Sequence, residues 1–309
     1  MKNRRFLCAA ALWTCLSPLS AALKLPSEAL PPARTATVYG AKIVYYEAGT
    51  GPTLVLVHGM GASASLDWGQ VIKPLAARYR VIALDQIGWG LSDKPTIDYT
   101  IDTWVDFLGE FLRTQNISHA AFAGESLGGW IVAKYAIAAA HDAQLPKVDK
   151  LILTDAAGHA ALFQARAGAA SSSFPYSRGP STLASYRDGF RGIFFNAKVP
   201  DDAFTLQMYK LKLSWRDADT GASLLSSLTG DPKRLAAQAV DGHLQEIHVP
   251  TLVVWGANDT LVPLADGQDF AKNIPGAKLV VIPECGHVPP VEKADEYVRT
   301  VVYFLGDGR

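Results

Sequence analysis

The sequence predicts an α/β fold in which a mostly parallel central sheet is flanked by helices and interrupted by a helical cap insertion. Short apolar runs without polar alternation recur along the chain, as is typical of strands buried on both faces of a parallel sheet. Stretches with helical periodicity separate these runs, so strands and helices alternate. The alternation stops near Ala156 and resumes at Pro250, which indicates an insertion between two strands.

The composition is that of a packed globular protein. The 309 residues are 49% hydrophobic and 19% charged, enough for one large core. The formal net charge is zero and the charges are scattered, so neither nucleic acid nor an anionic membrane is a predicted partner. No Cys/His cluster has metal-ligand spacing, and we expect no metal and no cofactor. The expected partner is a small-molecule substrate, and the oligomeric state is left open.

The amino-terminal segment is typical of an export signal. A basic start is followed by an uncharged apolar run from Phe6 to Leu16 and by small residues at Ser20 and Ala22. This pattern predicts a signal peptide over residues 1–22. An uncleaved membrane anchor is the alternative, although the apolar run is short for a spanning helix.

Cleavage would leave a mature chain, residues 23–309, with Cys285 as its single thiol. One thiol cannot form an internal disulfide, so the fold must rest on its hydrophobic core. We therefore expect an exported protein, periplasmic or secreted, without stable membrane association after cleavage.

The first half of the mature chain shows the clearest alternation of elements. Prolines predict an extended arm or linker over residues 23–37, and aromatic and β-branched residues predict a strand near a sheet edge over 38–47. Further strands are predicted at Thr53–Val57, Arg80–Asp85, Ala120–Ala123 and Lys150–Thr154. Helices are predicted between them at Trp68–Tyr79, Ile101–Thr114 and Leu127–Ala140.

The second half begins with the predicted cap, roughly residues 157–245, where no clear strand run occurs. Strands then return at Pro250–Trp255 and Ala277–Ile282, and a last helix is predicted at Ala294–Leu305. The cap segment is rich in aromatic side chains. We expect most of them to pack the cap onto the sheet and a few to line an apolar pocket.

The motif G-x-S-x-G, from Gly124 to Gly128, lies between a predicted strand and a predicted helix. A serine hydroxyl is a weak nucleophile unless a sharp turn exposes its oxygen next to a base. Glycines two residues on either side leave room for such a turn. The setting predicts Ser126 as a catalytic nucleophile.

The predicted base is His287, which follows the last strand run, where site residues of parallel sheets are expected. The predicted acid is Asp259, just past the preceding strand, because it would hold the histidine tautomer and stabilise the imidazolium. The chain order Ser126, Asp259, His287 is the one expected for this arrangement. Asp155 is the alternative acid and His159 the alternative base, since both follow the strand that ends at Thr154.

A fourth element, an oxyanion hole, is expected after the first buried strand. The loop His58–Gly61 follows that strand directly. The backbone N–H of Leu127, next after the nucleophile, and the N–H of Met60 are the two predicted donors. His58 is interpreted as a structural partner of the loop rather than as a base.

These motifs together resemble the α/β-hydrolase superfamily over nearly all of residues 23–309. The segments that carry the resemblance are His58–Gly61, Asp85–Pro95, Gly124–Gly129, Trp255–Asp259 and Gly286–His287. Dehalogenases and epoxide hydrolases of this superfamily have an aspartate at the position of Ser126, so serine implies acyl chemistry. The carboxyl-terminal part is similar to meta-cleavage product hydrolases, although those typically have tryptophan where this chain has Val288.

The resemblance implies a serine hydrolase that cleaves carboxylic esters of small or medium apolar substrates through an acyl-enzyme. A carbon–carbon bond hydrolase of the meta-cleavage product type is the first alternative. Arg178, Arg187 and Arg191 could then meet a substrate carboxylate, although solvated arginines are the simpler expectation. A ligand-binding, receptor-like protein on the same fold is the alternative from another functional class.

Overall fold

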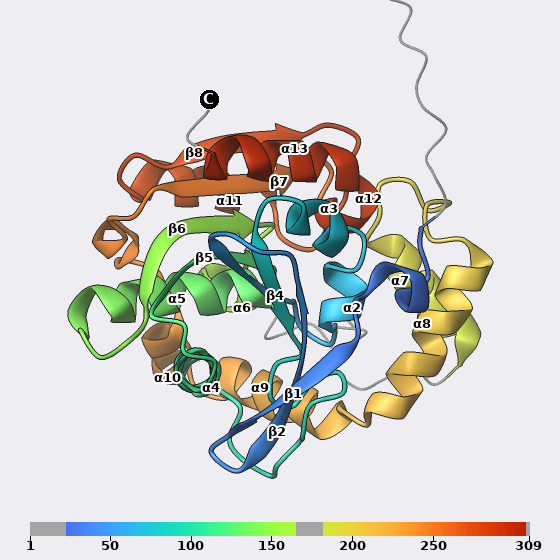
Figure 1. Ribbon diagram of the computed structural model, residues 1–309, viewed down its shortest axis with the longest axis horizontal. Coiled ribbons are helices and arrows are strands. Elements are labelled where there is room, and N and C mark those ends of the chain that lie inside the picture. Colours follow the sequence, from blue (N-terminus) through green and yellow to red (C-terminus); the bar gives the residue numbers. More distant parts are fainter. Residues whose placement is uncertain (1–22, 165–181, 307–309) are drawn as a thin grey trace, which may run out of the picture.

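The computed structural model describes residues 23–164 and 182–306 (Figure 1). The predicted signal peptide, residues 1–22, lies outside the described residues, and so does the cap segment 165–181, which contains Arg178. Within the described part, no helix is both long and apolar enough to cross a membrane.

An eight-stranded sheet forms the centre of the molecule, with the strand order β1-β2-β4-β3-β5-β6-β7-β8. Its strands are β1 (Ala33–Val38), β2 (Ala41–Ala48), β3 (Thr53–Val57), β4 (Arg80–Leu84), β5 (His119–Glu125), β6 (Lys147–Thr154), β7 (Thr251–Gly256) and β8 (Lys278–Ile282). The hairpin β1–β2 is antiparallel and joins β4 in antiparallel register, whereas all pairs from β4 to β8 are parallel. The predicted mostly parallel sheet is confirmed.

Successive residues of the inner strands face opposite sides of the sheet. In β3, Val55 and Val57 belong to one hydrophobic cluster, whereas Leu54 and Leu56 belong to another. Each strand therefore needs apolar residues at every position, which explains the runs without polar alternation.

Helices cover both faces of the sheet (Figure 1). The helices α4 (Ile101–Thr114), α5 (Leu127–His141) and α11 (Leu264–Asn273) pack against the first cluster. The helices α3 (Ile72–Ala76) and α13 (Ala294–Leu305) pack against the second. The bounds of α4 and α13 are those predicted. The helix predicted at Trp68–Tyr79 is shorter than expected, since only α3 lies within that range, and the separate short helix α2 (Ala64–Asp67) precedes it.

The amino-terminal arm differs from the prediction. Residues 23–37 were expected to form an extended arm or linker, but they contain the short helix α1 (Pro26–Ala29) and most of β1. β1 pairs with β2 through the two-residue turn Tyr39–Gly40, in which both residues have positive φ, 50° and 82°. Such turns match the twist of a hairpin, but they are usually signalled by Asn-Gly or Asp-Gly. The sequence carried no such signal.

Between β6 and β7 the described residues form helices and loops and no strand. These are α6 (Ala160–Gln164), α7 (Leu183–Gly192), α8 (Asp202–Trp215), α9 (Ala218–Thr229), α10 (Pro232–Gln238) and the 3₁₀ turn η2 (Leu244–Glu246). Aromatic side chains of α7 and α8 form a third hydrophobic cluster with Val288 and Val291, next to the predicted base. The insertion is thereby attached directly to the loop that follows β8. The predicted cap limits, roughly 157–245, stay a prediction.

Candidate active site

Ser126 lies at the turn between β5 and α5, with φ 52° and ψ −115°. A positive φ is uncommon for a residue with a side chain and is maintained only when its surroundings enforce it. Here the surroundings are crowded backbone: a Cβ on Gly124 would lie 2.2 Å from the Gly128 carbonyl oxygen, and one on Gly128 would lie 2.0 Å from that of Val57. The flanking glycines therefore allow the turn that exposes Ser126.

Asp259 and His287 meet at the carboxyl end of the sheet. His287 Nδ1 donates to Asp259 Oδ2 at 2.7 Å, and the other carboxylate oxygen, Oδ1, accepts the N–H groups of Leu261 and Val262. Both side chains are buried. A carboxylate held by three donors is suited to fix the tautomer of the histidine and to stabilise its protonated form.

The loop that carries His287 is attached to the insertion. The backbone N–H of His287 donates to the carbonyl of Ile193, just after α7, at 2.8 Å. Glu292, in α12 (Pro289–Glu292), accepts the N–H groups of Gly286, Phe195 and Asn196. The position of the histidine thus depends on the insertion as well as on the sheet. Glu292 was not identified from the sequence.

The structure brings Ser126, His287 and the predicted oxyanion donors Met60 and Leu127 to one cavity. No hydrogen bond joins Ser126 Oγ to His287 Nε2 in the described structure, and the carboxyl oxygen Glu125 Oε1 lies 3.4 Å from Nε2. Catalytic contacts often tighten only when substrate binds. The predicted roles of the five residues therefore remain predictions that are compatible with the geometry.

The loop of the predicted oxyanion hole is held by three buried side chains. His58 donates from Nδ1 to the Gly59 carbonyl and accepts the Gln86 backbone N–H at Nε2. Burial lowers the pKa of His58 to about 4, so the ring is neutral, as its predicted structural role requires. Asp67 Oδ2 accepts the Gly59 N–H at 2.7 Å, and Lys212 Nζ donates to the Gly61 carbonyl at 3.0 Å. The Gly59 N–H is thus engaged elsewhere and does not compete with Met60 as an oxyanion donor.

The alternative acid and base are placed differently. Asp155 Oδ1 accepts the Gly256 N–H at 2.8 Å, and burial, followed by the nearby Asp259 charge, raises the pKa of Asp155 well above its usual range. His159 Nδ1 contacts Asp241 at 2.9 Å and is not among the residues lining the cavity. Asp155 is therefore a neighbour of the acid–base pair, and His159 is part of a separate contact.

Asp155, Asp259 and His287 also satisfy one geometric condition for a metal site, since one ligand atom of each lies within 4.8 Å of the others. However, the facing atoms of Asp259 and His287 are joined by a hydrogen bond. The group therefore resembles an acid–base pair with a neighbouring carboxyl group more closely than a set of free metal ligands.

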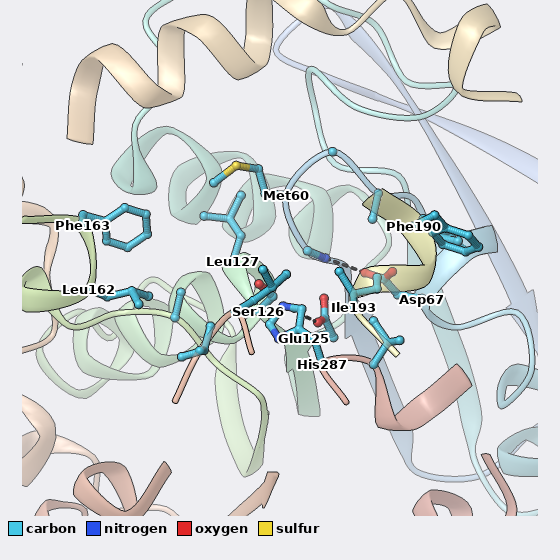
Figure 2. A pocket seen from close by; sticks show the side chains of 18 residues that line it. Met60, Asp67, Glu125, Ser126, Leu127, Leu162, Phe163, Phe190, Ile193 and His287 are labelled. Atoms are coloured by element: carbon cyan, nitrogen blue, oxygen red, sulfur yellow. Dashed lines mark hydrogen bonds and ion pairs between the residues drawn. The ribbon is translucent and has the colours of Figure 1, made fainter. Parts of the chain in front are cut away.

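Two further carboxyl groups, Asp67 and Glu125, lie beside Ser126 in the cavity wall (Figure 2). Burial raises the pKa of Asp67 to about 6. Burial and the Asp67 charge raise the pKa of Glu125 well above its usual range. Sequence reasoning missed both residues. Glu125 stands inside the G-x-S-x-G motif as an unspecified position, and nothing local signals that Asp67 faces it.

The rest of the cavity is apolar (Figure 2). On one side of Ser126 lie Leu127, Met60, Leu162 and Phe163; on the other lie Ile193 and Phe190, next to Asp67. Phe190 is thus one of the cap aromatics that line the pocket. Most of the others whose positions are described pack away from it, including Tyr186, Phe194, Phe204 and Trp215.

Of the three cap arginines named from the sequence, Arg187 and Arg191 are described, and neither lines the cavity. Arg191 donates to Asp202 at 2.9 Å, and Arg187 lies 3.7 Å from the same carboxylate. Both are paired on the surface of the insertion. A role in binding a substrate carboxylate is therefore not supported for these two residues.

Comparison with known proteins identifies the family. Residues 52–294 match the family model for the alpha/beta hydrolase fold. A curated relative, 2-hydroxy-6-oxo-6-(2'-aminophenyl)hexa-2,4-dienoic acid hydrolase of Metapseudomonas resinovorans, is 29% identical over 86% of this chain and 88% of its own length.

Two solved structures agree with the observed topology. A meta-cleavage product hydrolase from Pseudomonas fluorescens IP01 superposes with a TM-score of 0.75 at 23% identity, covering 89% of this chain and 98% of its own. A membrane phospholipase A superposes with a TM-score of 0.74 at 27% identity, covering 91% and 87%. Since the family model covers most of its length, the chain belongs to the alpha/beta hydrolase fold family, and it is a hydrolase.

Proposed function

We propose that this hydrolase is a serine esterase that cleaves carboxylic esters of small or medium apolar substrates. The observation that carries the proposal is the cavity at Ser126, whose lining is mainly apolar and contains no Lys or Arg among its described residues. An ester with an aliphatic or aryl group fits such a lining without leaving a charge unpaired. Among the similar solved structures is that of a membrane phospholipase A, which supports this choice.

The proposed mechanism has two halves. His287 takes the proton of Ser126 as Oγ attacks the ester carbonyl, and the Met60 and Leu127 N–H groups receive the oxyanion. The C–O bond breaks, the alcohol leaves with the proton from His287, and an acyl-enzyme remains. Water then attacks the acyl group with His287 as base, which releases the carboxylic acid and restores Ser126. Asp259 keeps the imidazole oriented throughout.

A second candidate, carbon–carbon bond hydrolysis of a ring-fission product, is favoured by the names of several relatives. Besides the relative from Metapseudomonas resinovorans, other relatives at 26–29% identity carry names of dienoate or semialdehyde hydrolases. The substrates in those names include dienoic acids, which are anionic at neutral pH. The acidic, cation-free lining described for this cavity is the reason for ranking ester cleavage first.

The test begins with a fluorophosphonate probe and intact mass analysis of the mature chain, wild type beside Ser126→Ala. We expect one adduct on the wild type and none on the variant, because only an activated serine reacts. Both proteins are then assayed on p-nitrophenyl esters and on a ring-fission dienoate. Faster turnover of the dienoate would replace ester cleavage by the second candidate. A folded wild type without adduct or turnover would instead support a receptor-like protein.

We also propose that residues 1–22 direct export to the periplasm or medium and are then removed. The basic start, the apolar run and the small residues before Leu23 support this. Expression of the full chain in a bacterial host, followed by fractionation and amino-terminal sequencing, tests it. A mature protein that begins with Met1 and remains with the membrane would indicate an uncleaved anchor.

A further inference from the structure

Asp67 and Glu125 form a buried acid pair in the cavity wall, and nothing in the proposed mechanism uses them. Asp67 comes from α2 and Glu125 from the end of β5. Both are almost fully buried, at 3% and 2% exposure. A Cβ on Gly59 would lie 2.3 Å from Glu125 Oε2 and 3.4 Å from Asp67 Oδ2, so the two carboxyl groups lie close together. Two buried carboxyl groups this close resist simultaneous ionisation, so Glu125 holds its proton more tightly than Asp67. The pKa of Asp67 is raised to about 6, and above that pH the pair carries a negative charge.

The pair is not neutralised by a cation. Asp67 Oδ2 accepts only the neutral Gly59 N–H. Glu125 Oε1 is buried and has no hydrogen-bond partner, although His287 Nε2 lies 3.4 Å away. Burying a polar oxygen without a partner is costly. An unsatisfied oxygen in the wall next to the nucleophile points to a group supplied by the ligand.

Cations near the site are committed elsewhere. Lys212, from α8, is held by both Asp217 oxygens at 2.9 and 2.8 Å and by the Gly61 carbonyl. Arg187 and Arg191 pair with Asp202. Among the described residues that line the cavity, the ionisable ones are Asp67, Glu125 and His287. A substrate therefore meets an apolar space with an acidic wall.

We infer that the Asp67–Glu125 pair selects substrates by charge: the site accepts esters with neutral or cationic acyl chains and rejects esters whose acyl chain carries a carboxylate. The inference rests on the proposed esterase function. Charges interact more strongly in a water-poor cavity than in bulk water, so the pair acts on a charged group on either side of Ser126. Phe190 and Ile193, which lie beside the pair (Figure 2), limit the water that could screen it.

Three p-nitrophenyl esters of similar chain length test the inference: the neutral heptanoate, the anionic adipate monoester and the cationic 6-aminohexanoate. For the wild type at pH 7.5 we expect kcat/KM for the adipate monoester to be at least about tenfold below that for the heptanoate, which corresponds to about 1.4 kcal/mol. The 6-aminohexanoate is expected to match or exceed the heptanoate. The double variant Asp67→Asn/Glu125→Gln keeps the shape of the pair and removes its charge. In this variant we expect the ratio of kcat/KM for the heptanoate to that for the adipate monoester to fall severalfold.

The matched control is Glu110→Gln, which removes an acidic side chain of α4 that does not line the cavity. It should leave the relative kcat/KM values for the three esters unchanged. Equal kcat/KM of the wild type for the heptanoate and the adipate monoester would overturn the inference without any variant. The inference would also be overturned if the double variant still hydrolysed the heptanoate but discriminated against the adipate monoester as strongly as the wild type does. Failure of the wild type on all three esters, with no fluorophosphonate adduct, would overturn the esterase function itself and the inference with it.

Discussion

Two carboxyl pairs lie near the ring of His287, and they differ in what holds them. On the Nδ1 side, Asp259 accepts the histidine and two backbone N–H groups, and Asp155 lies behind it. On the Nε2 side, Glu125 Oε1 has no hydrogen-bond donor, and Asp67 accepts one N–H from Gly59. Hydrogen-bond donors stabilise a carboxylate, whereas burial without them favours the neutral acid. The same functional group is thus suited to orient a base on one side and to favour a neutral acid on the other.

The largest expected effect on activity comes from removing the imidazole of His287, which lies near both carboxyl pairs. In His287→Ala, kcat/KM for the neutral ester should fall about 10⁴-fold or more, because nothing else can take the Ser126 proton. His159→Ala is the matched control and should stay within about twofold of the wild type, since His159 does not line the cavity. Steady-state kinetics on p-nitrophenyl heptanoate decide this. If His159→Ala were the inactive variant, the assignment of the base would be wrong.

The next largest effect shows which of the two acids on the Nδ1 side, Asp259 or Asp155, orients His287. Asp259→Asn should lower kcat about 10³- to 10⁴-fold, because the amide favours the wrong histidine tautomer, as in other acid–histidine pairs. KM should change little, since Asp259 does not line the cavity. A kcat within tenfold of the wild type would mean that Asp155 supplies the carboxylate.

The acid pair on the Nε2 side is expected to affect stability through pH. The pKa of Asp67 rises from 3.8 to about 6 on folding, so the folded state binds this proton more tightly and wild-type stability declines as pH rises through that window. Asp67→Asn removes the decline. The stability of the variant relative to the wild type should therefore increase by up to about 3 kcal/mol between pH 3.8 and pH 6.

Urea unfolding of both proteins at several pH values from 4 to 7 measures this difference directly. Asp149→Asn, at an exposed ion pair with His119, serves as a control for a carboxyl group outside the cavity. A difference between Asp67→Asn and the wild type that is independent of pH, or that falls as pH rises, would contradict the buried-charge interpretation of Asp67.

The smallest expected effect is that of Asp155→Asn. Because burial and the Asp259 charge raise the pKa of Asp155 and so favour its neutral form, a neutral amide of the same shape should lower kcat less than tenfold. It should shift the free energy of unfolding by less than about 1 kcal/mol, provided that its oxygen still accepts the Gly256 N–H. Kinetics and urea unfolding at pH 7.5 check both values. A loss larger than that of Asp259→Asn would reverse the roles of the two acids.

The sequence alone determined the order and type of most elements, since strand and helix periodicity are local properties. Ile101–Thr114 and Ala294–Leu305 were predicted with the bounds observed for α4 and α13. The strand-end positions of Asp259 and His287 were also readable, because parallel strands gather their carboxyl ends at one edge. Their 2.7 Å contact agrees with that expectation.

The tertiary structure decided what no local pattern encodes. The pairing of β1 with β2 depends on a turn without a strong sequence signal. Asp67 and Glu125 are 58 residues apart in the sequence, and only the meeting of α2 with the end of β5 makes them a buried acid pair. The pKa of a carboxyl group reflects its burial and its neighbours rather than its residue type. The charge of the cavity, and with it the proposed choice of substrate, is therefore a property of the folded chain.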